Sequence, residues 1–120
     1  MVGKIYFSVP CDDGVLKVSQ DAVFSLVRNV FHENEDVSET SIPETYDAEL
    51  WSANKGILVS RGESDESCRI RVYVTVALGS AITERAAQIQ EQIKAAVEDC
   101  ASLKVLSVDV LVAGVSFPKQ

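Results

Sequence analysis

The segments RIRVYVTVAL (residues 69–78), GSAITERAAQIQEQIKAAVEDCAS (79–102) and LKVLSVDVLV (103–112) follow one another without interruption and decide the fold. In the first segment, apolar residues, mostly β-branched, occupy every second position, which predicts a strand with one buried face. In the second, apolar residues recur every three or four positions, which predicts an amphipathic helix. Alternation returns in the third. A strand, a helix of about 20 residues and a strand, each with one apolar side, predict a βαβ unit with a right-handed crossover.

The expected boundaries are Arg69–Leu78 for the first strand, Ser80 to about Cys100 for the helix, and Leu103–Val112 for the second strand. Ser80 or Thr83 is expected to cap the helix. The apolar face of the unit is predicted to comprise Ile70, Val72, Val74, Val76, Leu78, Ile82, Ala86, Ile89, Ile93, Ala96, Val97, Cys100, Leu106, Val108, Val110 and Val112. The opposite face of the two strands carries Arg69, Arg71, Tyr73, Thr75, Ala77, Ser107 and Asp109.

The first half of the chain predicts a hairpin, a second helix and a further strand. Two short apolar runs, Lys4–Val9 and Val15–Val18, flank an Asp-Gly pair, which is typical of a tight turn. Ser19 is expected to cap a helix that ends near His32, with Phe24 at the side of its packing stripe. The helix stripe consists of Ala22, Val23, Leu26, Val27, Val30 and Phe31. Lys55-Gly56 is predicted to start a strand over residues 57–60, which returns through a polar loop to Arg69.

These elements predict an α/β (α+β) fold of two layers. A mixed sheet of about four or five strands is expected to carry both helices on one face. A chain of 120 residues with 47% hydrophobic content fits one domain over residues 1–120.

Residues 33–54 are predicted to form a long acidic loop. Between Asn29 and Asn54 there is no Lys or Arg, while the segment holds seven acidic residues, which are Glu33, Glu35, Asp36, Glu39, Glu44, Asp47 and Glu49. Tyr46, Leu50 and Trp51 are expected to anchor its far end.

The charge balance excludes several classes of partner. A net charge of −7 and a pI near 4.6 disfavour binding to nucleic-acid phosphates and to anionic lipid. No apolar run is long enough to span a bilayer, so direct membrane insertion is not expected and the chain is predicted to be cytoplasmic.

No catalytic, cofactor-binding or metal site is predicted from the residues. Three cysteines cannot all pair within one chain; Cys100 is expected to be buried, and Cys11 or Cys68 to be the more exposed. His32 has no second ligand near it in sequence. Asp12-Asp13-Gly14 resembles a fragment of a calcium loop, but the other ligands are missing and turn chemistry explains it.

The order of motifs resembles the bacterial alkaline shock, or envelope stress-response, protein family. The resemblance is carried by Gly14–Ser19, Lys55–Val59, Ile70–Gly79, Ile82-Thr83-Glu84, Ile89-Gln90, Ile93, Ala96-Val97-Glu98, Leu103-Lys104-Val105, Val108-Asp109-Val110 and Ala113–Phe117. The chain departs from the family at Asp36-Val37, where a Gly-Val is usual, and in the acidic loop.

The resemblance implies a non-enzymatic, cytoplasmic envelope stress-response scaffold, self-associating and peripheral at the inner face of the membrane through an integral membrane partner. A small ligand-binding or regulatory module acting on a metabolic enzyme is the alternative, and an enzyme comes third because no catalytic constellation is present. The expected self-association face, which helices on the other side of the sheet would leave open, comprises Arg69, Arg71, Tyr73, Thr75, Ser107 and Asp109. The expected contact with the membrane partner is the acidic loop, through Glu35, Asp36, Glu39 and Glu44.

Overall fold

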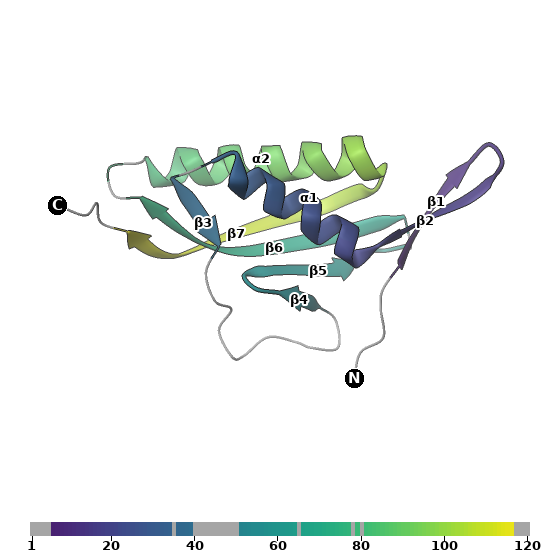
Figure 1. Cartoon of the computed structure of the whole chain (residues 1–120), viewed down its shortest axis with the longest axis horizontal. Helices are drawn as coiled ribbons and strands as arrows, with labels where there is room; N and C mark the ends of the chain where they lie inside the picture. Colours follow the sequence, from purple (N-terminus) through teal and green to yellow (C-terminus); the bar gives the residue numbers. More distant parts are fainter. Residues whose placement is uncertain are drawn as a thin grey trace.

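A computed structural model describes residues 6–34, 36–39, 51–64, 66–77, 79 and 81–116 of the chain (Figure 1). Its elements, in order, are β1 (Tyr6–Cys11), β2 (Gly14–Ser19), α1 (Gln20–His32), β3 (Val37–Glu39), β4 (Ser52–Asn54), β5 (Ile57–Arg61), β6 (Ser67–Ala77), α2 (Ile82–Ala101) and β7 (Lys104–Ser116).

Strand β6 is the centre of a five-stranded mixed sheet. One of its edges pairs antiparallel with β5 and, further along, with β3, while β4 extends the sheet beyond β5. The other edge pairs parallel with β7 along the whole length of β6. Because α2 connects these two parallel neighbours, the predicted strand–helix–strand unit is confirmed.

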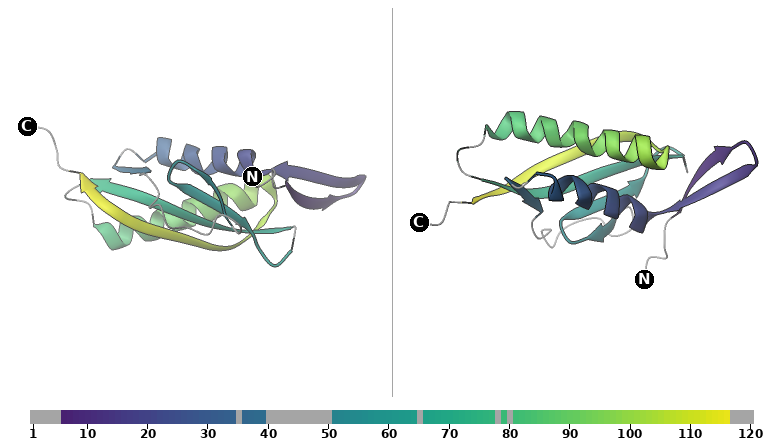
Figure 2. Two further views of the ribbon diagram at one scale, coloured as in Figure 1. Left: turned by 90° about the horizontal axis from the view of Figure 1, so that it is seen from below. Right: turned by 45° about the horizontal axis from the view of Figure 1, so that its top comes forward.

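Both helices lie on one face of this sheet, as Figure 2 shows. The alternation of β6 places Ile70, Val72, Val74 and Val76 in the interior, where they belong to one hydrophobic cluster with residues of both helices. Ile89 and Ile93 of α2 are fully buried in that cluster. Burial of apolar surface at this interface is the main force holding the two layers together. The predicted two-layer α+β class is confirmed.

Helix α1 begins where the sequence indicated. The backbone N–H of Ala22 donates to the Ser19 hydroxyl, 3.2 Å away, which satisfies one of the amides that have no partner within the helix. Phe24 differs from the prediction: it is buried in the core and not at the side of the stripe.

Helix α2 differs from the prediction at both ends. Its N-cap is Ala81, with no side-chain capping bond, and Thr83 lies inside the helix. At the other end the buried stripe continues from Val97 to Ala101, so Cys100 is exposed and its predicted burial was wrong. Ala101, four positions after Val97, continues the buried stripe. Cys100, three positions after Val97, points away from the sheet.

The β1–β2 hairpin is confirmed, but it forms a separate two-stranded sheet that projects from the end of the molecule (Figure 1). Phe7 and Val9 are buried in the main core, whereas Val15 and Leu16 are exposed. Two strands of the main sheet, β3 and β4, come instead from the segment predicted to be a loop. Lys55-Gly56 forms the turn between β4 and β5, with Lys55 at a φ of 55°, and does not start the strand.

Candidate functional site

The residues predicted to share one face of the sheet lie together on it. This face lies away from the helices, and we call it the back face. In the parallel pairing of β6 with β7, Arg69 is the register partner of Ser107, and Arg71 is that of Asp109. Parallel register partners project from the same face of a sheet. The Arg71 guanidinium lies 3.5 Å from the Asp109 carboxylate, and both side chains are partly exposed. An ion pair of this exposure contributes little to stability, but it neutralises the carboxylate locally.

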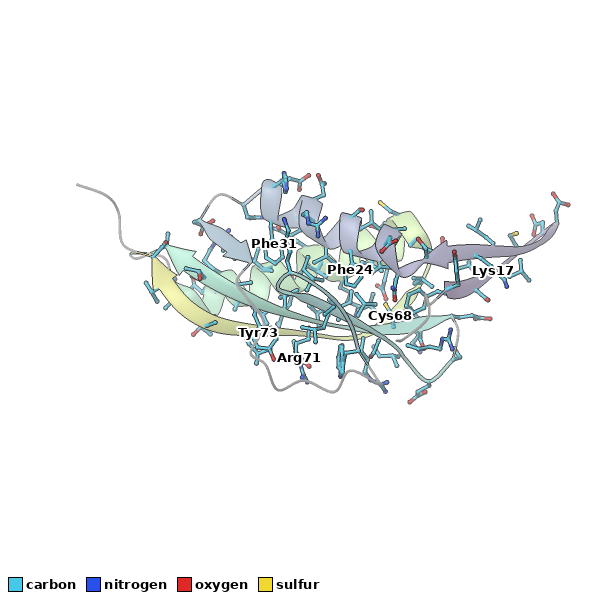
Figure 3. All side chains as sticks on the ribbon, turned by 60° about the horizontal axis from the view of Figure 1, so that its bottom comes forward. Lys17, Phe24, Phe31, Cys68, Arg71 and Tyr73 are labelled. Atoms are coloured by element: carbon cyan, nitrogen blue, oxygen red, sulfur yellow. The ribbon has the colours of Figure 1, made fainter. Side chains whose placement is uncertain are left out.

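The prediction that this face is open was wrong near its centre. Tyr73 is only 8% exposed and Leu58, which also points to the back face, is fully buried. Neither belongs to the hydrophobic cluster beneath the helices. The Arg71 guanidinium lies over the ring of Trp51, 4.8 Å from its centroid, in a cation–π contact (Figure 3 labels Arg71 and Tyr73). Apolar side chains are therefore buried on both faces of the sheet, not on one.

The acidic segment is brought together with α2 and not left free. Asp36 accepts two hydrogen bonds from Arg85 of α2, each 2.7 Å long. Arg85 also donates to Asn34, 2.9 Å away, and Asn34 donates to Gln92, so the loop after α1 is joined to the side of α2. The bond to Asp36 raises the pKa of Arg85 above its ordinary value. Asp36 is therefore bonded within the protein, and its predicted contact with a partner stays a prediction.

The other predicted acidic contacts lie outside the described side chains. Glu35 and Glu44 lie outside the described residues, and Glu39 belongs to β3, where only its backbone is described.

The three thiols are separated by their environments. Cys68 is buried in the core, and this burial, followed by the negative charge of Glu98, raises its pKa to about 12. A thiol with such a pKa stays protonated and unreactive near neutral pH. Cys11 and Cys100 are exposed. The predicted burial of Cys100 was therefore wrong, and of the two thiols expected to be the more exposed, Cys11 is exposed and Cys68 is buried.

His32 is exposed at the end of α1, beside a shallow hollow of about 230 Å³ shared with Ser25, Arg28 and Asn29. The Ser25 hydroxyl donates to the backbone carbonyl of Asp21 at 3.0 Å, so it is used within the helix. Among the residues that the structure describes, no group of three His, Cys, Asp or Glu side chains could hold a metal ion.

Two other hollows lie between elements. One, of about 390 Å³, lies at the base of the hairpin and is lined mainly by apolar side chains of β2, α1 and the end of α2. The other, of about 250 Å³, lies between α2 and β7, with Gln90, Glu91 and Lys94 on the helix side and residues 105–108 on the strand side. We call the second the α2–β7 groove.

The comparison with protein families decides the identity. The model of the alkaline shock protein 23 family, whose function is described as cell envelope-related, matches residues 4–117. The chain belongs to this family. The match runs from the hairpin to the end of β7, and it confirms the resemblance carried by the sequence motifs. Membership in the alkaline shock protein 23 family indicates a cell envelope-related function for this chain.

No curated protein and no solved structure matched the chain. Within the described part of the chain, no helix is both long and apolar enough to cross a membrane.

Proposed function

We propose that this family member is a non-enzymatic scaffold of the envelope stress response, which works at the cytoplasmic side of the membrane and is held there by an integral membrane protein. The observation that carries the proposal is the family match over residues 4–117, with its cell envelope-related function.

Recruitment by a protein, and not by lipid, is supported by charge. The net charge of −7 opposes adsorption to anionic headgroups, which attract basic segments. The same charge attracts a partner with a basic cytoplasmic segment. The contact is proposed at Glu35, Glu39 and Glu44, because Asp36 is already bonded to Arg85. Attraction of this kind between exposed charges weakens as salt is raised.

Flotation of the purified protein with membranes tests the proposal. We expect binding to native membrane vesicles at low salt, release at high salt, and no binding to protein-free anionic liposomes. A triple variant, Glu35→Gln with Glu39→Gln and Glu44→Gln, should release at lower salt than the wild type. The matched control, Asp12→Asn with Asp13→Asn and Asp99→Asn, removes three exposed carboxylates elsewhere and should bind as the wild type does. Binding to bare liposomes, or to neither membrane, would contradict the proposal.

Self-association is the second part of the proposal, because a scaffold has to join several copies or partners. The part of the back face that remains partly exposed, around Arg69, Thr75 and Asp109, supports it with a polar surface beside the partly exposed Trp51. Arginine and aromatic side chains are enriched in protein interfaces.

The hollow at the base of the hairpin supports the alternative of a ligand-binding module. Its volume of about 390 Å³ and apolar lining lie within the range of small-molecule sites. Native mass spectrometry of protein purified from its own cells would detect a retained ligand as extra mass. A bare mass at every stage would contradict this alternative and leave the scaffold proposal intact.

A further inference from the structure

The edge of the sheet formed by β7 is long and apolar. With 13 residues, β7 is the longest strand described, and its inner edge pairs with β6. Its outer edge pairs with no strand among the described residues. Figure 2 (left) shows β7 along this margin of the sheet. The opposite margin is formed by β4, which has three residues. Very short edge strands are one way in which proteins prevent unwanted pairing, and β7 lacks that protection.

The chemistry of β7 also lacks the usual protection. Asp109 is the single charged residue between residues 105 and 116, and this stretch contains no proline. Leu111 is 38% exposed and Val112 is 37% exposed, on opposite faces of the strand, and Val115 is similarly exposed. Charged and proline residues are what normally keep an exposed edge from pairing.

Two irregularities define the usable part of the edge. The register with β6 passes over Leu106 and Ala113, which marks a bulge at each. Bulges disturb the hydrogen-bonding row of a strand. The six residues between them, Ser107–Val112, keep regular register with β6, so their outward N–H and C=O groups form an uninterrupted row. Such a row accepts another strand by main-chain hydrogen bonds.

Charge identifies the occupant as a second copy of this chain. The chain is strongly acidic, so two copies repel each other over most of their surface. Around β7, however, the charges cancel: Arg71 neutralises Asp109, and Glu91 and Lys94 lie together on the wall of the α2–β7 groove. Two copies therefore repel each other less here than over the rest of their surface. When two β7 strands pair antiparallel about a two-fold axis, the two Asp109 residues lie opposite each other only if the axis passes at that residue. In every other register, the two Asp109 carboxylates are not directly opposed.

We propose that two copies join through the Ser107–Val112 stretches of their β7 strands, antiparallel about a two-fold axis, to form one continuous sheet. The α2 helices then flank the junction on one side, and Leu111 and Val112 are covered by the partner copy. The inference rests on the self-association part of the proposed function and replaces the back face with the sheet edge as the principal interface.

The double variant Leu111→Lys with Val112→Lys tests the edge. It raises the net charge from −7 to −5, so general repulsion between copies falls and any loss of association is local. The matched control is Val15→Lys with Leu16→Lys, which makes the same charge change at two exposed apolar residues of the hairpin. Analytical ultracentrifugation should show a dimer for the wild type and the control. For the edge variant, the dissociation constant of the dimer should be at least about tenfold higher. Circular dichroism and thermal melting check that the variants fold.

Disulfide cross-linking provides a test that needs no disruptive substitution. In a background with Cys11→Ser and Cys100→Ser, single cysteines are placed in turn at positions 107–112. Oxidation should yield a cross-linked dimer most strongly at the position nearest the two-fold axis, with falling yield on both sides. Equal association of wild type, edge variant and control, with no cross-linking peak, would overturn the edge and leave self-association standing. A wild type that is monomeric at all concentrations would overturn self-association as well.

Discussion

Truncation of Ile93 tests the packing of α2 on the sheet. Ile93 lies in the middle of α2 and is fully buried in the cluster that joins the helices to β6. Replacing Ile with Ala removes three carbon atoms, worth about 0.8 kcal/mol each in transfer free energy. The cavity left behind adds to this, so the expected loss of unfolding free energy is about 2 to 5 kcal/mol. A domain of this size has about 5–15 kcal/mol in total, and the loss is therefore a large fraction of it.

Urea denaturation followed by circular dichroism measures this loss. Ile82→Ala is the matched control, because it makes the same chemical change in the first turn of α2, where the side chain is 40% exposed. The control should lose less than about 1 kcal/mol. A shift of midpoint with an unchanged denaturant slope would show that stability changed without a change in the surface exposed on unfolding. A loss below about 1 kcal/mol for Ile93→Ala, or equal losses for the two variants, would show that the packing argument is wrong.

Three further predictions concern the ion pair and the thiols. Arg85→Gln should lower the unfolding free energy by about 1–2 kcal/mol, because Asp36 loses two charge-assisted hydrogen bonds in a partly exposed site. If Arg85→Gln costs the same unfolding free energy in an Asp36→Asn background, the pairing is contradicted. Because the pKa of Cys68 is raised, the folded state keeps a proton that the unfolded state releases. The unfolding free energy should therefore fall as pH rises from about 9 to about 12, more steeply than in Cys68→Ala. Parallel curves of unfolding free energy against pH for the two proteins would refute this. A thiol reagent at neutral pH should label Cys11 and Cys100 in the folded protein and Cys68 only after unfolding, and mass spectrometry of the labelled peptides would reveal the opposite order.

The central unit of the fold was predictable because its apolar residues recur at regular intervals. Nine residues of alternation in β6, Arg69–Ala77, and about five and a half turns of helical spacing in α2 indicate their buried faces without knowledge of what covers them. Strands β3 and β4 have three residues each, which is too short for a period to be recognised, and they lie at the two ends of a run of acidic and turn-forming residues. They are strands because the neighbouring strands β6 and β5 provide backbone N–H and C=O groups for pairing, which the short segments themselves do not reveal.

The candidate surface was predictable in its membership but not in its exposure. Alternation placed Arg71 and Tyr73 on the same face, and register confirms this. Whether that face meets water depends on what lies against it, and Trp51, 20 positions before Arg71 in sequence, contacts its guanidinium. Arginine and threonine on a face predict that it is exposed to solvent, although tyrosine and the aliphatic stems of arginine are readily buried.

The placement of the arginines connects the acidity of the chain with its proposed interactions. Asp36 and Asp109 are indistinguishable from other carboxylates in the sequence, yet each lies against an arginine, from a position 49 residues away in the first case. These arginines neutralise carboxylates beside the helix layer and along the β6–β7 side of the sheet. The unbalanced negative charge is consequently left to other parts of the chain, such as Asp12 and Asp13 at the tip of the hairpin. An acidic protein with a neutral, apolar sheet edge can repel copies of itself in most orientations and still accept one orientation, and that selectivity is what an ordered assembly requires.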